Sequence, residues 1–201
     1  MELVETNELE KSLTFLASWK YREIEIGSGN GHFLAEYGVR NNTCCLLGIE
    51  LKQKRCLKIR DKINKKQLAN IRVFQGMAEL LLERLPPSSI DAFHLYYPDP
   101  WPKTKQRKRR LLKLSSLERF YIALKENGRI YFTSDIFDYY IQVKLLAILH
   151  GGFQFGDCGL PGEAIHSLYA ARTLSMGKAA YSLVLVKNAT GNLTMRVEAA
   201  T

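Results

Sequence analysis

Strand-like and helix-like segments alternate along most of this chain, and that alternation limits the folds that it can adopt. Short apolar segments are typical of buried strands, whereas longer segments with apolar residues three and four apart are typical of helices. Strands are predicted at residues 21–26, 43–50, 71–75, 90–97, 129–133 and 181–187. Helices are predicted at residues 31–40, 52–67, 78–84, 109–125 and 136–150. This alternation is typical of an α/β fold with a doubly wound, parallel sheet.

Length and composition agree with one domain of that kind. The chain has 201 residues, of which 46% are hydrophobic, and this is enough for a sizeable buried core. We expect a single domain over residues 1–201, with a short N-terminal segment at 1–20 and a frayed tail at 188–201. No apolar run approaches the roughly 18 residues of a membrane span, and the acidic start is unlike a secretory signal or transit peptide.

The four cysteines favour a reducing compartment. No two of the cysteines form a C-x-x-C pair, and none has a histidine at metal-ligand spacing. They are Cys44, Cys45, Cys56 and Cys158. The first two lie in an apolar strand-like run, where a reduced cysteine behaves as a small core residue. We therefore expect a cytoplasmic protein without a metal site.

A glycine loop follows the first predicted strand. Residues 27–31 read G-S-G-N-G, and glycine lets the backbone turn tightly and approach a ligand closely. The spacing differs from the dinucleotide pattern G-x-G-x-x-G. Glu50 ends the second strand, where a carboxylate can accept hydrogen bonds from a ribose. The combination is typical of S-adenosylmethionine (SAM) methyltransferases, although an ordinary strand-to-helix turn with a chance acid is the alternative.

A rigid acidic turn and a run of cations follow the fourth strand. Asp99 lies between two prolines, which fix φ and exclude helix at the residue before them. Seven of the eleven residues after Pro102 are Lys or Arg, namely Lys103, Lys105, Arg107, Lys108, Arg109, Arg110 and Lys113. The net charge of +9 favours nucleic acid or an anionic surface as a partner. We interpret the cations as holding a polyanion while Asp99 acts on one group within it; pairing with Lys103 or capping of the turn is the alternative.

These motifs together resemble the bacterial, single-subunit tRNA (guanine-N7)-methyltransferase family. The resemblance implies a Rossmann-like SAM-dependent methyltransferase fold, with a mostly parallel seven-stranded sheet and an antiparallel last strand. It extends from about residue 23 to residue 187. The segments that carry it are residues 25–29, 48–50, 98–101, 108–110 and 133–135, together with Lys103.

The resemblance also implies roles for individual residues, with Asp99 as the active-site acid. Cofactor contacts are implied for Glu25, Gly27, Ser28, Gly29, Gly31, Glu50, Met77, Ala78 and Asp99. Substrate contacts are implied for Lys103, Asp135, Thr173 and Met176. RNA contacts are implied for Lys105, Gln106, Arg107, Lys108, Arg109 and Arg110. The implied partner is tRNA, methylated at a variable-loop guanosine, and the protein is expected to be a monomer or homodimer.

Three departures from the family pattern keep alternatives open. Met77 stands where the family often has an acid or amide, and Met176 stands where the family's T-x-x-E motif has its glutamate. About twenty residues precede the first strand, fewer than is usual in the family. One alternative is therefore a weakened member that binds RNA without turnover, and the other is a SAM methyltransferase with a different substrate.

Two further features have two readings each. Asp135 follows the fifth strand, where ligands of open α/β sheets bind, but it could also cap the helix that starts at residue 136. A lysine recurs every fourth residue along the helix at 52–67, which indicates either a solvated face or an RNA contact. Its members are Lys54, Lys58, Lys62 and Lys66.

Overall fold

The computed structural model describes residues 2–157, 159–162, 175–177 and 179–188. The strands are β1 Tyr21–Ile26, β2 Cys44–Glu50, β3 Ile71–Gln75, β4 Ile90–Tyr96, β5 Leu124–Ser134, β6 Phe153–Phe155 and β7 Tyr181–Lys187. The helices are α1 Glu2–Ala17, α2 His32–Arg40, α3 Gln53–Lys66, α4 Ala78–Leu82, α5 Leu114–Ala123 and α6 Phe137–His150. A 3₁₀ helix, η1 Thr104–Arg109, lies between β4 and α5.

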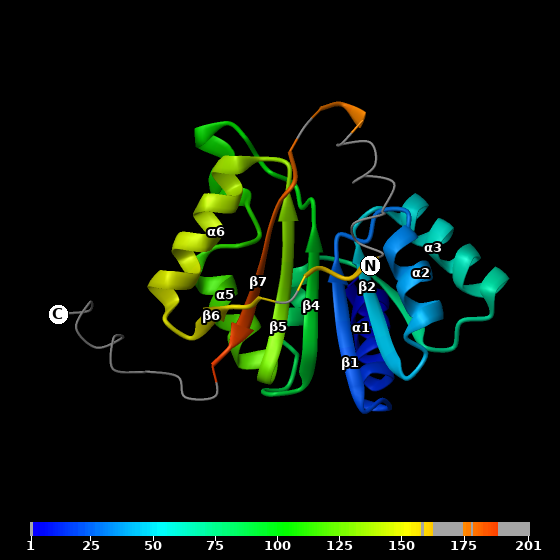
Figure 1. Ribbon diagram of the computed structural model, residues 1–201. Helices are drawn as coiled ribbons and strands as arrows, with labels where there is room; N and C mark the ends of the chain where they lie inside the picture. The colour runs from blue at the N-terminus through cyan, green and yellow to red at the C-terminus, as the bar shows by residue number, and fades with distance from the viewer. Residues whose placement is uncertain (1, 158, 163–174, 178, 189–201) are drawn as a thin grey trace.

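The seven strands form one sheet in the order β3-β2-β1-β4-β5-β7-β6 (Figure 1). Strands β1 to β5 pair in parallel, and β7 pairs antiparallel to both β5 and β6. The chain runs from β1 outward through β2 to β3 and then crosses back to β4 on the other side of β1. The strand order therefore reverses between β1 and β4. The predicted doubly wound, mostly parallel sheet with an antiparallel last strand is confirmed.

Side chains of β2 show how the sheet separates two apolar clusters. Cys45 and Leu47 belong to the larger cluster, which contains residues of α1, α4 and α5, whereas Leu46 belongs to a smaller cluster with α2 and α3. Successive side chains of a strand point to opposite faces of the sheet, so the two groups of helices cover opposite faces. All seven residues of β2 are buried, as expected for a strand covered on both sides.

Several element boundaries differ from the prediction. The segment at 1–20 contains helix α1, because Leu9 and Leu16 are buried against the sheet on one side of an otherwise polar helix. Strand β6 was not located from the sequence, since it has only three residues and depends on pairing with β7. The helix predicted from residue 109 starts at Leu114, because η1 and an extended stretch come first. Within the described ranges, no helix has the length and apolar character needed to cross a membrane.

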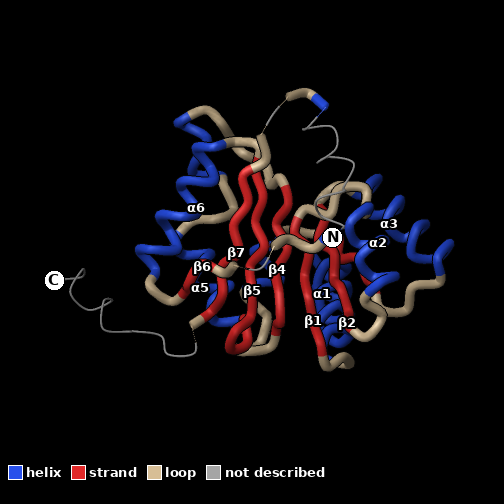
Figure 2. The backbone as a smooth tube through the Cα atoms, in the orientation of Figure 1, coloured by secondary structure: helices blue, strands red, loops and turns tan. Residues whose placement is uncertain are grey.

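The carboxyl ends of the parallel strands meet at one edge of the sheet, the upper edge in Figure 1, where the arrow of β5 ends. The glycine loop follows β1, Glu50 ends β2, and Asp99 and Asp135 follow β4 and β5. Figure 2 shows tan loops above the sheet at this edge, as well as others at the lower edge. Residues that are far apart in the sequence thus face a common region, at the position where open α/β sheets bind ligands.

Candidate functional site

The glycine loop is held against the end of β2 by its own backbone. The N–H groups of Gly27 and Ser28 both donate to the carbonyl of Ile49, at 2.9 and 3.0 Å. Gly29 and Gly31 have φ of 56° and 69°, in the left-handed region that favours glycine. A Cβ on Gly31 would lie 2.7 Å from Cγ1 of Ile59 on α3, so any other residue there would force the Ile59 side chain to move. The loop needs its last glycine both for backbone conformation and for close packing.

Glu50 holds the same loop through its carboxylate. Its Oε2 accepts the N–H of Gly29 at 2.9 Å, and its Oε1 accepts the N–H of Lys52 at 2.9 Å. The guanidinium of Arg55 lies 3.5 Å from Oε2. Each carboxylate oxygen has more than one acceptor site, so both can still accept a ligand hydroxyl. Glu50 therefore fixes the shape of the glycine loop and remains suited to a ribose contact.

Glu25 is a buried acid beneath the loop. Its Oε2 has no hydrogen-bond partner, and only 5% of the residue is exposed. Burial, with a smaller contribution from the negative charge of Glu50, raises the pKa of Glu25 from 4.5 to about 7, against an opposing hydrogen bond from Ser28. A buried oxygen without a partner is costly in a folded protein. Oε2 of Glu25 is therefore suited to accept a hydrogen bond from a ligand bound against the glycine loop.

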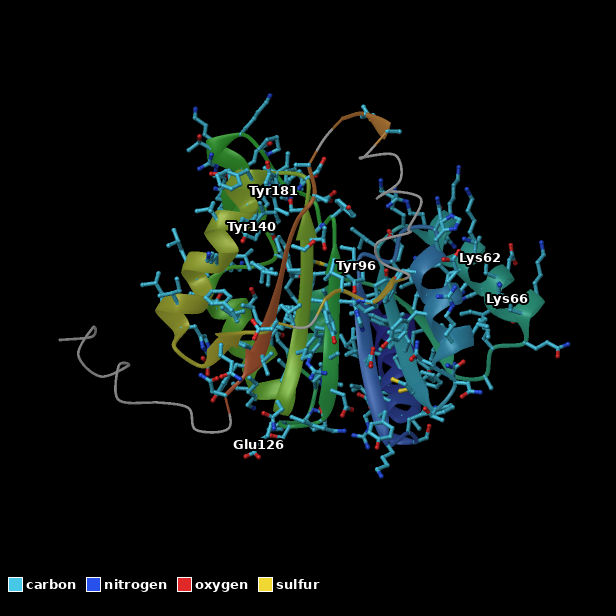
Figure 3. All side chains as sticks on the ribbon, in the orientation of Figure 1. Lys62, Lys66, Tyr96, Glu126, Tyr140 and Tyr181 are labelled. Atoms are coloured by element: carbon cyan, nitrogen blue, oxygen red, sulfur yellow. The ribbon has the colours of Figure 1, made fainter. Side chains whose placement is uncertain are left out.

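A lysine of α3 also contacts the glycine loop, which sequence reasoning missed. Nζ of Lys62 donates to the carbonyl of Asn30 at 2.7 Å and lies 3.2 Å from Nδ1 of His32. An ammonium group has no acceptor, so Nδ1 must accept and His32 must be neutral. Burial and the charge of Lys62 lower the pKa of His32 in agreement with that state. Lys62 and Lys66 are labelled on α3 in Figure 3, and only the tertiary contact distinguishes Lys62 from the other members of the lysine stripe.

The turn that carries Asp99 is bounded by two residues in a left-handed conformation. Tyr97 and Trp101 have φ of 51° and 41°. A left-handed backbone conformation costs free energy for bulky residues, and such strained residues are concentrated at functional sites. The N–H of Tyr97 donates to the carbonyl of Thr133 at 2.8 Å, which attaches the turn to β5. Asp99 itself is exposed and forms no ion pair with Lys103 within the described chain. The turn presents the carboxylate to solvent at the carboxyl edge of the sheet.

Arg110 does not lie on the surface with the rest of the basic run, so the prediction that it contacts RNA is wrong. The residue is 1% exposed, and its guanidinium donates to the carbonyl of Pro100 and to Oδ2 of Asp138, each at 2.7 Å. It also bonds to Gln142 and lies over the ring of Tyr139, 4.6 Å from the centroid. A charge is buried only when it is paired, and these partners satisfy it. Arg110 instead ties the Asp99 turn to α6.

The other cations of the run lie on η1 and are exposed. Lys105, Arg107, Lys108 and Arg109 are accessible, whereas Gln106 is half-buried. Arg107 lies 3.3 Å from Oδ1 of Asp138, and the guanidinium of Arg109 lies 5.1 Å from the centroid of the Trp101 ring. Trp101 thus packs beneath a cation next to the Asp99 turn. In Figure 1 this segment lies above α6, at the same edge as the ends of β4 and β5.

The remaining predicted residues have simpler positions. Lys103 is exposed at the start of η1, Met77 is exposed after β3, and Ala78 is buried. Asp135 is half-buried and precedes Ile136, which is the N-cap residue of α6, so Asp135 is not itself the helix cap. Met176 is exposed, and Thr173 lies outside the described residues. In the part of the chain that the structure describes, no group of His, Cys, Asp and Glu side chains could hold a metal ion.

Sequence comparison places the chain among known proteins. A family described as "Putative methyltransferase" matches residues 20–156. A tRNA (guanine-N(7)-)-methyltransferase of Nitrosococcus oceani is 32% identical over 164 residues, which are 81% of this chain and 70% of that protein. The chain belongs to the tRNA (guanine-N7)-methyltransferase family. The family member from Agrobacterium fabrum is 38% identical over 141 residues, covering 70% of this chain.

The matched family region contains most of the candidate site. Residues 20–156 include the glycine loop, Glu50, the Asp99 turn and Asp135, but not Met176. The chain spans about six-tenths of the length of the curated relatives that it matches, 61% for the Agrobacterium protein. Among solved structures, the 16S rRNA methyltransferase KamB aligns with a TM-score of 0.65 at 15% identity, over 87% of this chain and 91% of that one. At that identity the likeness concerns the fold alone.

Proposed function

We propose that this protein transfers the methyl group of SAM to N7 of a guanosine in tRNA. The observation that carries the proposal is the meeting of two parts at one edge of the sheet. The glycine loop framed by Glu25 and Glu50 lies there, and so does the Asp99 turn with its exposed cations. The names of the family members at 32% and 38% identity support the same activity.

The residues after β1, β2 and β3 fit the cofactor. SAM supplies an activated methyl group when it is bound. The partnerless Oε2 of Glu25 and the acceptor capacity of Glu50 suit the polar groups of a nucleoside amino acid, while the glycines leave room for close approach. Exposed Met77 offers a flexible apolar surface for an adenine ring, and its neighbour Ala78 is small.

Methyl transfer to guanine N7 requires no acid–base catalysis by the protein. Guanine N7 has an in-plane lone pair and no proton, so a new N7–carbon bond forms without a general base while the sulfur–carbon bond breaks. Most of the rate enhancement then comes from alignment of the nucleophile with the methyl group. Positive charge develops on the guanine, and the carboxylate of Asp99 stabilises it electrostatically. The positive φ angles of Tyr97 and Trp101, which flank Asp99, support this electrostatic role rather than proton abstraction.

Substrate recognition is assigned to both sides of the Asp99 turn. Lys103 and Asp135 flank the turn at the ends of β4 and β5, and Thr173 and Met176 complete the proposed substrate set. Phosphate contacts are assigned to the exposed side chains of η1, where cations neutralise the RNA backbone. These are Lys105, Gln106, Arg107, Lys108 and Arg109. A cytoplasmic location agrees with the buried thiols of Cys44, Cys45 and Cys56, which form no disulfide.

The test is methyl transfer to RNA with identification of the product nucleoside. The protein is incubated with methyl-labelled SAM and unmodified tRNA transcripts, and the RNA is digested and separated. We expect labelled 7-methylguanosine, lost in Asp99→Ala and kept in Glu126→Ala, which alters an exposed acid at the opposite edge of the sheet (Figure 3). Binding of both SAM and tRNA without label transfer would instead identify a non-catalytic RNA-binding member, and label in another nucleoside would identify a different substrate.

A further inference from the structure

Three aromatic side chains gather beside the proposed substrate residues. Phe137 and Tyr140 lie in the first turns of α6, and Tyr181 begins β7 next to Ser134 of β5. The ring centroids of Phe137 and Tyr181 are 5.0 Å apart, those of Tyr140 and Tyr181 5.8 Å, and those of Phe137 and Tyr140 6.2 Å. The rings therefore form one contiguous aromatic cluster across two elements. Figure 3 labels Tyr140 and Tyr181 close together, near the edge of the sheet where β5 ends.

The cluster is open to solvent on one side. Phe137 is 55% exposed, and Tyr140 and Tyr181 are each half-buried. An exposed phenylalanine contributes little to the core, whereas its two neighbours hold the ring in a defined place. Phe137 is two residues from Asp135, so the cluster lies beside the proposed position of the target guanosine.

The cations of η1 are joined to the same turn of α6. Asp138, the residue after Phe137, pairs with Arg107 at 3.3 Å and with Arg110 at 2.7 Å. Asp138 thus joins η1 to the turn of α6 that carries Phe137. Aromatic rings next to a positively charged surface are the combination that single-stranded nucleic acid requires, since its bases stack while its phosphates meet cations.

We propose that Phe137, Tyr140 and Tyr181 form a stacking platform for an unpaired base of the RNA, next to the guanosine that is methylated. The proposal rests on the proposed function for the identity of the RNA, but stacking is measured by binding and not by methyl transfer. A base that is presented for chemistry must leave its own stack, and a protein ring that accepts a neighbouring base offsets that loss. The platform supplies this contact, with Phe137 as its accessible ring.

The experiment compares RNA affinity across Phe137→Leu, Phe137→Trp and Leu149→Ala at several salt concentrations. Leucine keeps an apolar side chain but removes the ring, and tryptophan keeps a ring. Leu149 is 75% exposed near the other end of α6 and serves as the matched control. The probe is an unmodified tRNA transcript, with a single-stranded oligonucleotide containing 2-aminopurine as a second probe, since stacking quenches its fluorescence.

We expect Phe137→Leu to weaken binding about tenfold, within the range for loss of one stacked base. The slope of log affinity against log salt stays unchanged, because no phosphate contact is lost. Phe137→Trp and Leu149→Ala retain affinity, and quenching is lost only in the leucine variant. Unchanged affinity and quenching in folded Phe137→Leu would overturn the platform even if the protein methylates tRNA. Loss of stacking in a protein that transfers no methyl group would support the platform and reject the activity.

Discussion

The guanidinium of Arg110 donates to Asp138 at 2.7 Å although Arg110 is 1% exposed and the Asp138 side chain is 45% exposed. The pair thus spans from the interior to the surface. It connects the segment after the Asp99 turn to the first turn of α6, which also carries Phe137. Arg110 thus positions the Asp99 turn relative to the first turn of α6, although it belongs to the basic run in the sequence.

Replacement of Arg110 is expected to destabilise the fold. In Arg110→Met the carbonyl of Pro100 and the side chain of Gln142 lose a charged donor, and Asp138 loses its closest partner. Asp138 is 45% exposed and regains water in the variant, so the cost arises mainly from the partly buried acceptors at Pro100 and Gln142, and we expect about 2 kcal/mol. Urea denaturation of the variant beside Arg109→Met, which alters an exposed neighbour, measures the difference. Normal stability with reduced RNA affinity would return Arg110 to the RNA-contacting set.

Glu25 is expected to make folding stability fall as the pH rises. Its pKa is about 7 in the folded protein and 4.5 in the reference state, so the folded state binds more protons between these values. The contribution of Glu25 to the free energy of unfolding is therefore greatest below about pH 4.5. It declines as the pH rises toward 7, by up to about 3 kcal/mol. Unfolding free energies at pH 5 and pH 8 measure it. Glu25→Gln, which is neutral throughout, should remove this part of the dependence, and an identical pH profile in the variant would contradict it.

Lys62 is expected to position the glycine loop for the cofactor. Lys62→Met keeps the length of the side chain but removes the hydrogen bond to the carbonyl of Asn30. We expect SAM to bind roughly fivefold more weakly, equivalent to about 1 kcal/mol for one charged hydrogen bond at a partly exposed site. Titration calorimetry with SAM measures this. Lys66→Met, one turn further along α3, is the matched control and should bind SAM normally; equal loss in both variants would indicate a general effect of charge.

Charge reversal on η1 is expected to weaken RNA binding and leave SAM binding unchanged. Arg109→Glu removes a cation that lies over Trp101 and faces solvent, and Arg107→Glu adds a like charge beside Asp138. Each lost phosphate contact should lower the salt slope of tRNA binding by nearly one unit. Fluorescence anisotropy over a range of salt concentrations tests this, with SAM affinity measured in parallel. A matching loss of SAM affinity would show that the segment acts structurally.

The alternation of strands and helices was predictable because period and turn residues are local properties of the sequence. Strands β1, β3 and β7 were predicted with the bounds that the structure shows. The glycine loop and the Asp99 turn were also recognisable, since glycine and proline restrict the backbone at the positions where they occur. Helix α1 was not recognised, because only burial of a few leucines distinguishes it from a polar tail.

The sequence by itself determined the order of the elements, the parallel sheet and therefore the edge at which the site forms. Tertiary structure alone decided which members of each charged run perform which task. Arg107, Arg109 and Arg110 are close in sequence, yet only Arg110 is buried, because the chain turns there toward Asp138 and Gln142. Charge pairing and aromatic clustering depend on distances between elements, and those distances are set by packing across the sheet rather than by any local pattern.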